Sequence, residues 1–286
     1  MKISNFANQN FRMRNLCLIF VLALGITSCG EYNKVLKGNS TEDKFNLAKE
    51  FYLESIETGK RGKMLKALRL FEQIQPGMRG KPQNEIVSYY IANGTYEIGD
   101  YLTSGYKFER FIKSFPDTEK KEEAAYKSAD SYYKASPVYS LDQTETLKAI
   151  DKLQIYLNAY PEGNYFEEAN NHLAELRDKL EKKQYEIAKN YNHREFWQPA
   201  AHALNNFIDA NPGSKYNEAA YYYKFESQFI YAQKSFKSLM RERLEEAQKY
   251  YADYIERYPE GEFLNQANEL KAEMQLLYEE LDTLEL

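Results

Sequence analysis

The fold of this chain follows from one stretch, Phe111-Ile112-Lys113-Ser114-Phe115-Pro116, in which an aromatic residue stands five positions before a proline. The same spacing occurs five times, from Phe71 to Pro76, Phe111 to Pro116, Tyr156 to Pro161, Phe207 to Pro212 and Tyr254 to Pro259. The prolines are 40, 45, 51 and 47 residues apart, close to the length of a repeating pair of helices with its turns. Because proline cannot continue a helix, each stretch predicts that a helix ends there.

A second pattern precedes the same prolines. Twelve positions before each proline the residue is small in four cases and methionine in the first, namely Met64, Ser104, Ala149, Ala200 and Ala247. Eight positions before each proline the residue is bulky, namely Leu68, Phe108, Leu153, Leu204 and Tyr251. Residues at these spacings share one helix face. The small residue lets a neighbouring helix approach, and the bulky one fills the space beside it.

These patterns predict an all-α fold. Each such helix follows another whose inner face pairs a small residue with an aromatic one, as in Ala48 with Tyr52, Ala92 with Tyr96, Ala129 with Tyr133 and Ala188 with Tyr191. The unit resembles the tetratricopeptide repeat. We therefore expect an α-α superhelix, or solenoid, of five tetratricopeptide-like hairpins and a C-terminal capping helix. The hairpins are expected at about 42–75, 82–115, 119–160, 165–211 and 215–258, and the capping helix at about 263–282.

The N-terminal segment is typical of an export signal. Lys2, Arg12 and Arg14 precede an apolar run from Leu16 to Ile26, which is too short to span a bilayer as a helix. The start at Met1 or at Met13 is left open. Ile26-Thr27-Ser28-Cys29 resembles a bacterial lipobox, which implies cleavage after residue 28 and acylation of Cys29. The alternative is an ordinary thiol beside an ordinary signal.

Three segments are therefore expected. Residues 1–28 are a cleaved lipoprotein signal peptide, 29–40 a lipid-anchored tether with an N-cap at Thr41, and 41–286 one continuous repeat domain. Acyl chains anchor a protein to a membrane surface without spanning it. Gly30, rather than an aspartate, follows the cysteine, which favours the outer membrane with the body facing the periplasm.

Charge and chemistry exclude several classes of function. The formal charge is −5 for the whole chain, and loss of the three basic residues before Cys29 makes it −8, so nucleic acid is not an expected partner. His172, His193 and His202 do not have the spacing of a metal site. No nucleophile elbow or phosphate-binding glycine loop occurs. We expect no metal, no cofactor and no enzymatic activity.

Aromatic residues are the unusual component, with 26 tyrosines and 16 phenylalanines. Most are expected to fill the core between hairpins. Tyr221, Tyr222 and Tyr223 are consecutive and spread over about 200° of a helix, so at least one should be partly exposed. Exposed tyrosine suits a protein interface, because it offers a large contact area and a hydroxyl that stays hydrated.

Particular segments resemble the BamD family, the lipoproteins of the machine that folds β-barrels into the outer membrane. The helix ends Phe111–Pro116 and Tyr254–Pro259 resemble that family's repeat ending. The run Tyr191-Asn192-His193-Arg194-Glu195-Phe196-Trp197-Gln198-Pro199-Ala200-Ala201 resembles the turn of its fourth hairpin, and Ser136–Asp142 resembles its lengthened loop. One departure is the second helix of repeat four, where the family often has a basic residue and this chain has Ala203 and Asn205.

The resemblance implies a scaffold with two partners. The carboxyl-terminal repeats would hold the periplasmic domains of the barrel-forming subunit, BamA, and the candidate contacts are Arg194, Trp197, Tyr221, Tyr222 and Tyr223. The amino-terminal repeats would offer a groove to unfolded outer-membrane protein clients, and the candidate contacts are Tyr89, Tyr90, Tyr96, Tyr126 and Tyr133. Arg194 and Trp197 could instead have a purely structural role. The open alternatives are a lipoprotein scaffold of cell-wall or division machinery and a nutrient-capturing lipoprotein, although chain length argues against the second. A third is an enzyme embedded in the solenoid, which would need acid and base residues converging in space that the sequence does not reveal.

Overall fold

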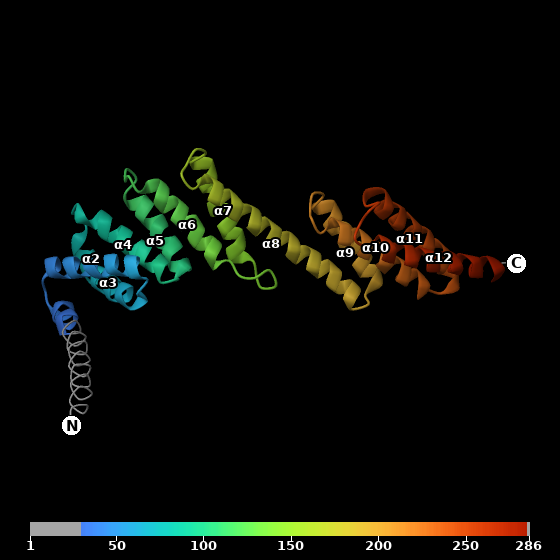
Figure 1. Cartoon of the computed structure of the whole chain (residues 1–286), viewed down its shortest axis with the longest axis horizontal. Helices are drawn as coiled ribbons and strands as arrows, with labels where there is room; N and C mark the ends of the chain where they lie inside the picture. Colours follow the sequence, from blue (N-terminus) through green and yellow to red (C-terminus); the bar gives the residue numbers. More distant parts are fainter. Residues whose placement is uncertain (1–29, 285–286) are drawn as a thin grey trace, which may run out of the picture. The chain divides into compact units, whose positions relative to one another are not determined.

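The structure, a computed structural model, describes residues 30–284 of the chain. The predicted signal peptide 1–28 and the predicted lipidation site Cys29 lie outside the described residues. Residues 30–284 contain helices and no strand (Figure 1). The predicted all-α fold of tetratricopeptide-like hairpins is confirmed. None of the helices in this range is long and apolar enough to cross a bilayer.

Five helical hairpins follow one another, close to the expected bounds, and a last helix follows the fifth. They are α2 (Thr41–Thr58) with α3 (Arg61–Ile74), α4 (Gln83–Glu97) with α5 (Tyr101–Ser114), α6 (Lys121–Ala135) with α7 (Thr144–Ala159), α8 (Phe166–His193) with α9 (Trp197–Ala210), α10 (Asn217–Gln233) with α11 (Lys237–Arg257), and then α12 (Leu264–Leu284). A short 3-10 helix, η1 (Gln75–Met78), follows α3.

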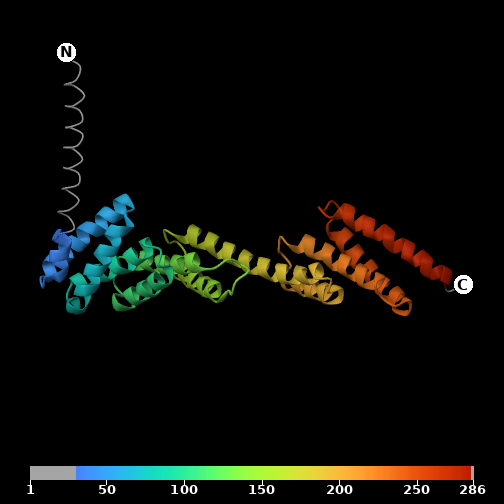
Figure 2. The same ribbon diagram turned by 90° about the horizontal axis from the view of Figure 1, so that it is seen from below.

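The described residues form two compact units. Unit 1 comprises the chain up to Ser136 together with 148–170, and unit 2 comprises 137–147 together with 171 onwards. Unit 1 thus holds the first two hairpins, α6 and most of α7, while unit 2 holds most of α8 and all later helices. In unit 2, α12 packs on both α10 and α11 (Figure 2). The expectation of one continuous domain over 41–286 stays a prediction.

Each second helix ends by the same hydrogen bond. The carbonyl of the aromatic residue five positions before the proline accepts the backbone N–H four residues later, at 2.9 Å for Phe111 and Phe115 and 2.9 Å for Tyr254 and Tyr258. The proline follows directly and has no N–H for the next carbonyl, so the helix cannot continue. All five aromatic residues are buried, namely Phe71, Phe111, Tyr156, Phe207 and Tyr254. The proline spacing therefore predicted the helix ends correctly.

The predicted packing face of the second helices is also confirmed. The residues twelve positions before the prolines are all completely buried, namely Met64, Ser104, Ala149, Ala200 and Ala247. Next to Ser104, Gly105 lets the ring of Tyr132 on α6 approach so closely that a Cβ atom would stand 2.9 Å from it. A serine hydroxyl holds this contact, because Ser128 Oγ donates to the Gly105 carbonyl at 3.0 Å. The hairpins of unit 1 therefore stack through small side chains.

Tyrosines of two second helices also bind the preceding first helix. The hydroxyl of Tyr156 in α7 donates to Glu122 of α6 at 3.3 Å, and that of Tyr254 in α11 donates to Glu218 of α10 at 3.3 Å. Burial raises the pKa of both tyrosines to about 12. In each of these hairpins the tyrosine ring therefore packs between the two helices, and its hydroxyl is hydrogen-bonded to a glutamate of the first helix.

The structure differs from expectation at the N-terminal side. Residues 30–37, which the sequence assigns to the tether, are helical, and Tyr32 is only 7% exposed. Its ring lies 6.1 Å from that of Phe51, and Val35 and Leu36 pack on the same cluster. Removing these apolar groups from water favours a docked segment over a free one. The N-cap of α2 is Ser40 rather than Thr41, because Ser40 Oγ accepts from the Asp43 N–H at 3.1 Å.

One inner-face pairing was wrong. Tyr191 was expected beside Ala188, yet it is 41% exposed. Asn192, four residues after Ala188, takes the buried place and donates to Glu226 at 2.9 Å and to Ser227 at 2.9 Å. A spacing of four residues brings side chains onto one face more directly than a spacing of three in this helix.

Gly105→Ala is expected to destabilise unit 1 by about 1–3 kcal/mol, because the added methyl group overpacks a rigid site. The site is rigid because Tyr132 is 1% exposed. The matched control is Gly62→Ala in α3, where no atom lies within 4 Å of the added carbon and a gain of up to about 1 kcal/mol is expected. Urea unfolding followed by circular dichroism measures both. Equal unfolding midpoints for the two variants would contradict the close approach of Tyr132 to α5.

Candidate protein-binding surfaces

The client-binding candidates belong to two adjacent first helices of unit 1, α4 and α6. Polar side chains join these helices at a constant offset of 34 residues. Tyr89 donates to Glu123 at 2.5 Å, Lys127 donates to Asn93, and Tyr96 donates to Asp130. We call the surface made by these contacts the α4–α6 ladder.

The five candidate tyrosines do not form one cluster. Tyr89 is buried, with its ring 5.7 Å from Phe111, and Tyr126 is buried in a parallel stack 4.4 Å from Tyr165. Tyr89 and Tyr126 therefore serve mainly to fill the core. Tyr90 is half-buried and faces the first hairpin, with its ring 4.4 Å from that of Tyr52. Tyr96 and Tyr133 are also half-buried, and Tyr96 lies at the end of the ladder, where its hydroxyl accepts from Lys134.

Several side chains of the ladder have shifted pKa values that keep their charge states constant. Burial and the hydrogen bond to Glu123 raise the pKa of Tyr89 well above its ordinary value. Burial and the hydrogen bond to Asp130 do the same for the pKa of Tyr96. Asp130 is 2% exposed and pairs with Lys134 at 2.9 Å. Although burial opposes it, hydrogen bonds to Tyr96 and Asp130 raise the pKa of Lys134. The tyrosines therefore stay neutral and act as oriented donors.

Sequence reasoning missed the acidic and basic members of the ladder. Glu123, Lys127, Asp130 and Lys134 look like ordinary helix-surface charges in the sequence. The signal that could have found them is the offset of 34 residues between a tyrosine of one first helix and a carboxylate of the next. The equivalent pairs Ala92 with Tyr96 and Ala129 with Tyr133 are 37 residues apart. The offset of 34 therefore joins positions about one helical turn away from equivalence.

The first partner-binding candidates lie in the turn between α8 and α9 of unit 2. Arg194 is exposed, and its guanidinium lies 5.2 Å from the centre of the Phe196 ring. Trp197 is half-buried, with the Lys234 ammonium 5.0 Å from its ring. Glu195 has a φ of 62°, a conformation that L residues rarely adopt, and its carboxylate pairs with Lys234 at 3.3 Å. The turn is therefore a tightly held structure that displays Arg194 and Phe196.

The next hairpin also exposes a phenylalanine at its turn. Phe236 is 83% exposed and stands at the N-cap of α11, as Phe196 stands at the N-cap of α9. The two turns are joined by Lys234 and by a hydrogen bond of 3.0 Å from Tyr231 to Gln198. We call the surface of Tyr191, Arg194, Phe196, Trp197 and Phe236 the turn patch. Phe236 was missed in the sequence because nothing local distinguishes it from a core phenylalanine.

The three consecutive tyrosines have different positions. Tyr221 and Tyr222 are 7% and 6% exposed, and Tyr222 stacks on Phe263 at 4.8 Å. Tyr223 is half-buried beside Lys189, whose ammonium lies 4.7 Å from its ring. The expectation that at least one of the three is partly exposed is confirmed. A partner contact through Tyr221 or Tyr222 stays a prediction, and both fill the core of unit 2.

A buried cation lies beside Asn205 of α9. Lys224 of α10 is 3% exposed and donates to Asn205 Oδ1 at 3.3 Å. Its ammonium also lies 4.2 Å from the Tyr250 ring and 3.9 Å from Asp253. Burial lowers the pKa of Lys224, although Asp253 acts in the opposite direction. This cation is therefore part of the interior of unit 2 and is not available to a partner.

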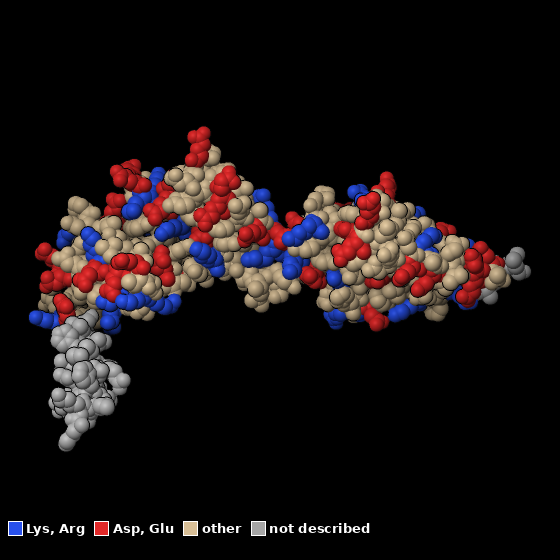
Figure 3. Space-filling model, viewed as in Figure 1, with Lys and Arg blue, Asp and Glu red and all other residues tan. Residues whose placement is uncertain are grey.

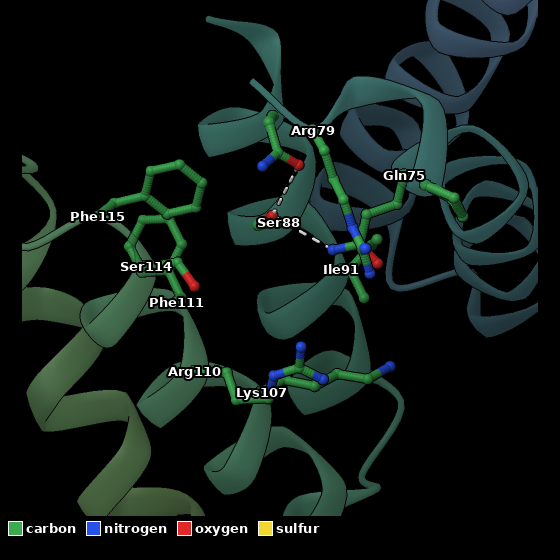
Figure 4. Close-up of a pocket in the computed structure, with 11 residues that line it drawn as sticks. Gln75, Arg79, Ser88, Ile91, Lys107, Arg110, Phe111, Ser114 and Phe115 are labelled. Atoms are coloured by element: carbon green, nitrogen blue, oxygen red, sulfur yellow. Dashed lines mark hydrogen bonds between the residues drawn. The ribbon is translucent and has the colours of Figure 1, made fainter. Parts of the chain in front are cut away.

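A hollow of unit 1 is lined by residues of η1, α4 and α5 (Figure 4). It measures about 410 Å³, and its walls carry Arg79, Lys107 and Arg110 but no carboxylate. Gln75 donates to Ser88 at 3.2 Å across one side. None of the five candidate tyrosines lines it. A smaller hollow of about 270 Å³ in unit 2 is lined by Tyr139 of the lengthened loop and by Lys183 and His193 of α8.

The lengthened loop is bound to α8. Lys183 donates to the carbonyls of Tyr139 and Leu141 at 3.2 and 2.7 Å, and Gln143 Nε2 donates to the Val138 carbonyl at 2.9 Å. Over residues 30–284 no three His, Cys, Asp or Glu side chains are grouped so that they could hold a metal ion. Of the histidines, His193 and His202 are exposed and His172 is half-buried. The expectation of no catalysis stays a prediction.

Comparison with known proteins gives a family match. The model of the YfiO family, described as an outer membrane lipoprotein, matches residues 45–206, which is more than half of the chain. A protein of Aquifex aeolicus named as an outer membrane protein assembly factor BamD is 28% identical over 151 residues, a match covering 50% of this chain and 48% of that protein. The chain thus spans about half the length of this curated relative.

Two of the solved structures that are similar to this chain contain TPR-like repeats. Two crystal structures of nearly identical TPR-like repeats of a kinesin light chain from Podosopora anserina, one of them carrying a single substitution, are each 12% identical with a TM-score of 0.31. The match to the substituted form covers 74% of this chain and 94% of that chain, and the other covers 76% and 98%.

The free energy of unfolding is expected to fall as pH rises above about 10, the pKa of an unfolded tyrosine. A tyrosine whose folded pKa is raised contributes stability that is complete below that pH and is lost as pH rises through the folded pKa. Burial raises the pKa of Tyr52, Tyr89 and Tyr96 in this way. Urea unfolding at several alkaline pH values measures the slope, which Tyr89→Phe should flatten. Tyr106→Phe, at a position that is 55% exposed, is the control, and an equal effect of both changes would contradict the assignment.

Proposed function

Because the chain belongs to the YfiO family of outer membrane lipoproteins, we propose that it is a non-enzymatic scaffold of the machinery that assembles β-barrels in the outer membrane. Acyl chains on Cys29 anchor it to that membrane, and residues 30–286 face the periplasm. Unit 2 binds the periplasmic domains of a BamA-like subunit, and unit 1 binds unfolded outer-membrane protein clients.

The turn patch is the observation that carries this proposal. Phe196 and Phe236 are 47% and 83% exposed, although each costs free energy in water. Exposed aromatic residues beside an arginine are typical of the residues that contribute most to protein interfaces. Two hairpins present the same residue type at the same N-cap position, so the patch is a repeated feature of the turns.

The patch suits a docking site because its shape is set before a partner arrives. The backbone N–H groups of Glu195 and Phe196 donate to the carbonyls of Asn192 and Tyr191, each at 2.9 Å. The exposed pair of Glu195 with Lys234 and the contact of Lys234 with the Trp197 ring add to this more weakly. The scaffold therefore loses little conformational entropy when a partner binds. Arg194 adds a charge with five N–H donors, which suits a carboxylate on the partner.

The α4–α6 ladder supports client binding by a different physical route. An extended peptide presents alternate side chains and unpaired backbone groups. Tyr96 and Tyr133 offer partly exposed rings, and Lys127 and Lys134 offer donors beside them. Hydrogen bonds to Asp130 and Asn93 hold these groups in position. The face can thus bind aromatic side chains without rearranging.

Phe236→Ala and Arg194→Glu are each expected to reduce co-purification with the BamA-like subunit by about tenfold, the effect of losing one strongly contributing interface residue. The measurement is affinity purification of the tagged chain from solubilised outer membranes, followed by quantitative mass spectrometry. Leu276→Ala in α12 is the matched control, because Leu276 is also an exposed apolar side chain, at 65%.

Full retention of the subunit by both variants would remove the turn patch from the proposal. Recovery of cell-wall or division proteins in place of a β-barrel subunit would favour the alternative scaffold. Loss with Leu276→Ala as well would show that the assay reports general surface changes.

A photo-crosslinking amino acid at position 96 or 133 is expected to capture an unfolded β-barrel client at least about threefold more than one at position 106, because local contact raises the effective concentration. Tyr106 is exposed on the second helix α5, away from the ladder. Buried Tyr89 and Tyr126 are avoided, since their replacement would disturb the core. Equal capture at all three positions would contradict client binding on the ladder.

A further inference from the structure

Very little free chain separates position 29 from the first hairpin. Residues 30–37 are helical, and Tyr32 is buried against Phe51 of α2. Three residues of chain from Cys29 to Tyr32 reach at most about 10 Å. An acyl anchor on Cys29 therefore holds the first hairpin close to the membrane, whereas a free tether of twelve residues would not.

Positive charge gathers at this docked end. The Lys66 ammonium lies 5.2 Å from the Tyr32 ring, and that of Lys63 lies 4.1 Å from the Phe51 ring. Lys34 and Lys37 are exposed on the docked segment itself. Figure 3 shows basic side chains along the lower edge of unit 1. We call the group Lys34, Lys37, Lys60, Lys63, Lys66 and Arg69 the anchor face.

Acidic side chains offset only part of this charge. Glu54 pairs with both Lys60 and Lys63, at 3.3 and 2.8 Å. Glu31 is exposed on the docked segment, and Glu72 follows Arg69 in α3 but pairs with Lys107 of α5 at 3.2 Å. One shared carboxylate cannot neutralise two ammonium groups. The anchor face therefore keeps an excess of positive charge.

The second helices of successive hairpins show that the excess is local. α3 carries four Lys or Arg and one acidic residue, and α5 carries three and one. α7 carries two of each, and α9 carries one acidic residue and no Lys or Arg. The chain as a whole is negative. α11 carries five of each. The excess is therefore greatest in α3 among the second helices, whereas α2 of the same hairpin carries five acidic residues and two lysines.

We propose that the anchor face binds the anionic phospholipid headgroups of the membrane that holds Cys29. The inference rests on the proposed acyl anchor. A cluster of four to eight basic residues beside a membrane attachment is typical of binding to anionic lipid. The attraction decays over a Debye length of about 8 Å at physiological salt, which is similar to the reach of the anchor. Lysine stems can keep their apolar carbons on Tyr32 and Phe51 while the ammonium groups contact phosphate.

The test uses the full acylated chain in vesicles of phosphatidylcholine, with or without phosphatidylglycerol. Mass spectrometry measures how fast a water-soluble amine reagent modifies each lysine. Lys34, Lys37 and Lys66 are expected to react at least about threefold more slowly with phosphatidylglycerol present, and roughly 1 M salt, where the Debye length is about 3 Å, should remove the difference. Lys249, exposed on α11 in unit 2, should react equally in both vesicles.

A charge-reversal pair makes the test specific. Lys37→Glu with Arg69→Glu should abolish the lipid-dependent protection of Lys34 and Lys66, because both replaced side chains are exposed members of the anchor face. Lys121→Glu with Lys249→Glu makes the same change of charge at exposed positions elsewhere and should leave the protection intact. Equal reactivity in both vesicles, or loss of protection in both double variants, would overturn the proposal.

Flotation of the vesicles in high salt distinguishes this inference from the proposed anchor. A chain that fails to float lacks a working acyl anchor. This result would contradict both the proposed function and the lipid-binding inference, which rests on it. A chain that floats without lipid-dependent protection retains its anchor, and only the inference is wrong. Protection in native outer membranes but in neither vesicle would show that a protein covers the anchor face, which also contradicts lipid binding.

Discussion

The structure depends on one backbone constraint, the missing N–H of a proline directly after each second helix. The carbonyl of Phe71, Phe111, Tyr156, Phe207 or Tyr254 accepts the last helical hydrogen bond, and the next carbonyl has no donor. The α-helix therefore ends at the same position in every hairpin, and after α3 the chain continues as the 3-10 helix η1. Because the helix end is fixed, the aromatic side chain before it is always buried at the same point of the stack.

Stacking then brings residues of successive first helices beside one another at a fixed offset. In unit 1 the pairs Tyr89 with Glu123 and Tyr96 with Asp130 are both 34 residues apart. In unit 2 Asn192 meets Glu226 at the same offset. Buried polar groups need partners, since an unpaired one costs free energy. These contacts therefore select the correct neighbour and alignment of the hairpins, which apolar packing alone specifies weakly.

Stacked hairpins offer extended surfaces for function rather than an enclosed site. The first helices of unit 1 present rings and ammonium groups, and the turns of unit 2 present Phe196, Arg194 and Phe236. The docked segment 30–37 adds a third surface, where basic residues surround the start of the fold. Each surface combines aromatic area with charge, so each suits a large partner better than a small molecule.

The outer bounds of the five hairpins and of the last helix were determined by the sequence alone, because a helix end depends on local backbone chemistry and on proline. All five hairpins and the last helix were predicted to within a few residues. Arg194 and Trp197 could be singled out through a family resemblance. Exposure could not be predicted, because it depends on which neighbouring helix covers a side chain. Tertiary structure alone decided that Tyr89, Tyr126, Tyr221 and Tyr222 are buried, that Phe236 is exposed, and that Tyr32 docks the segment expected to be a tether.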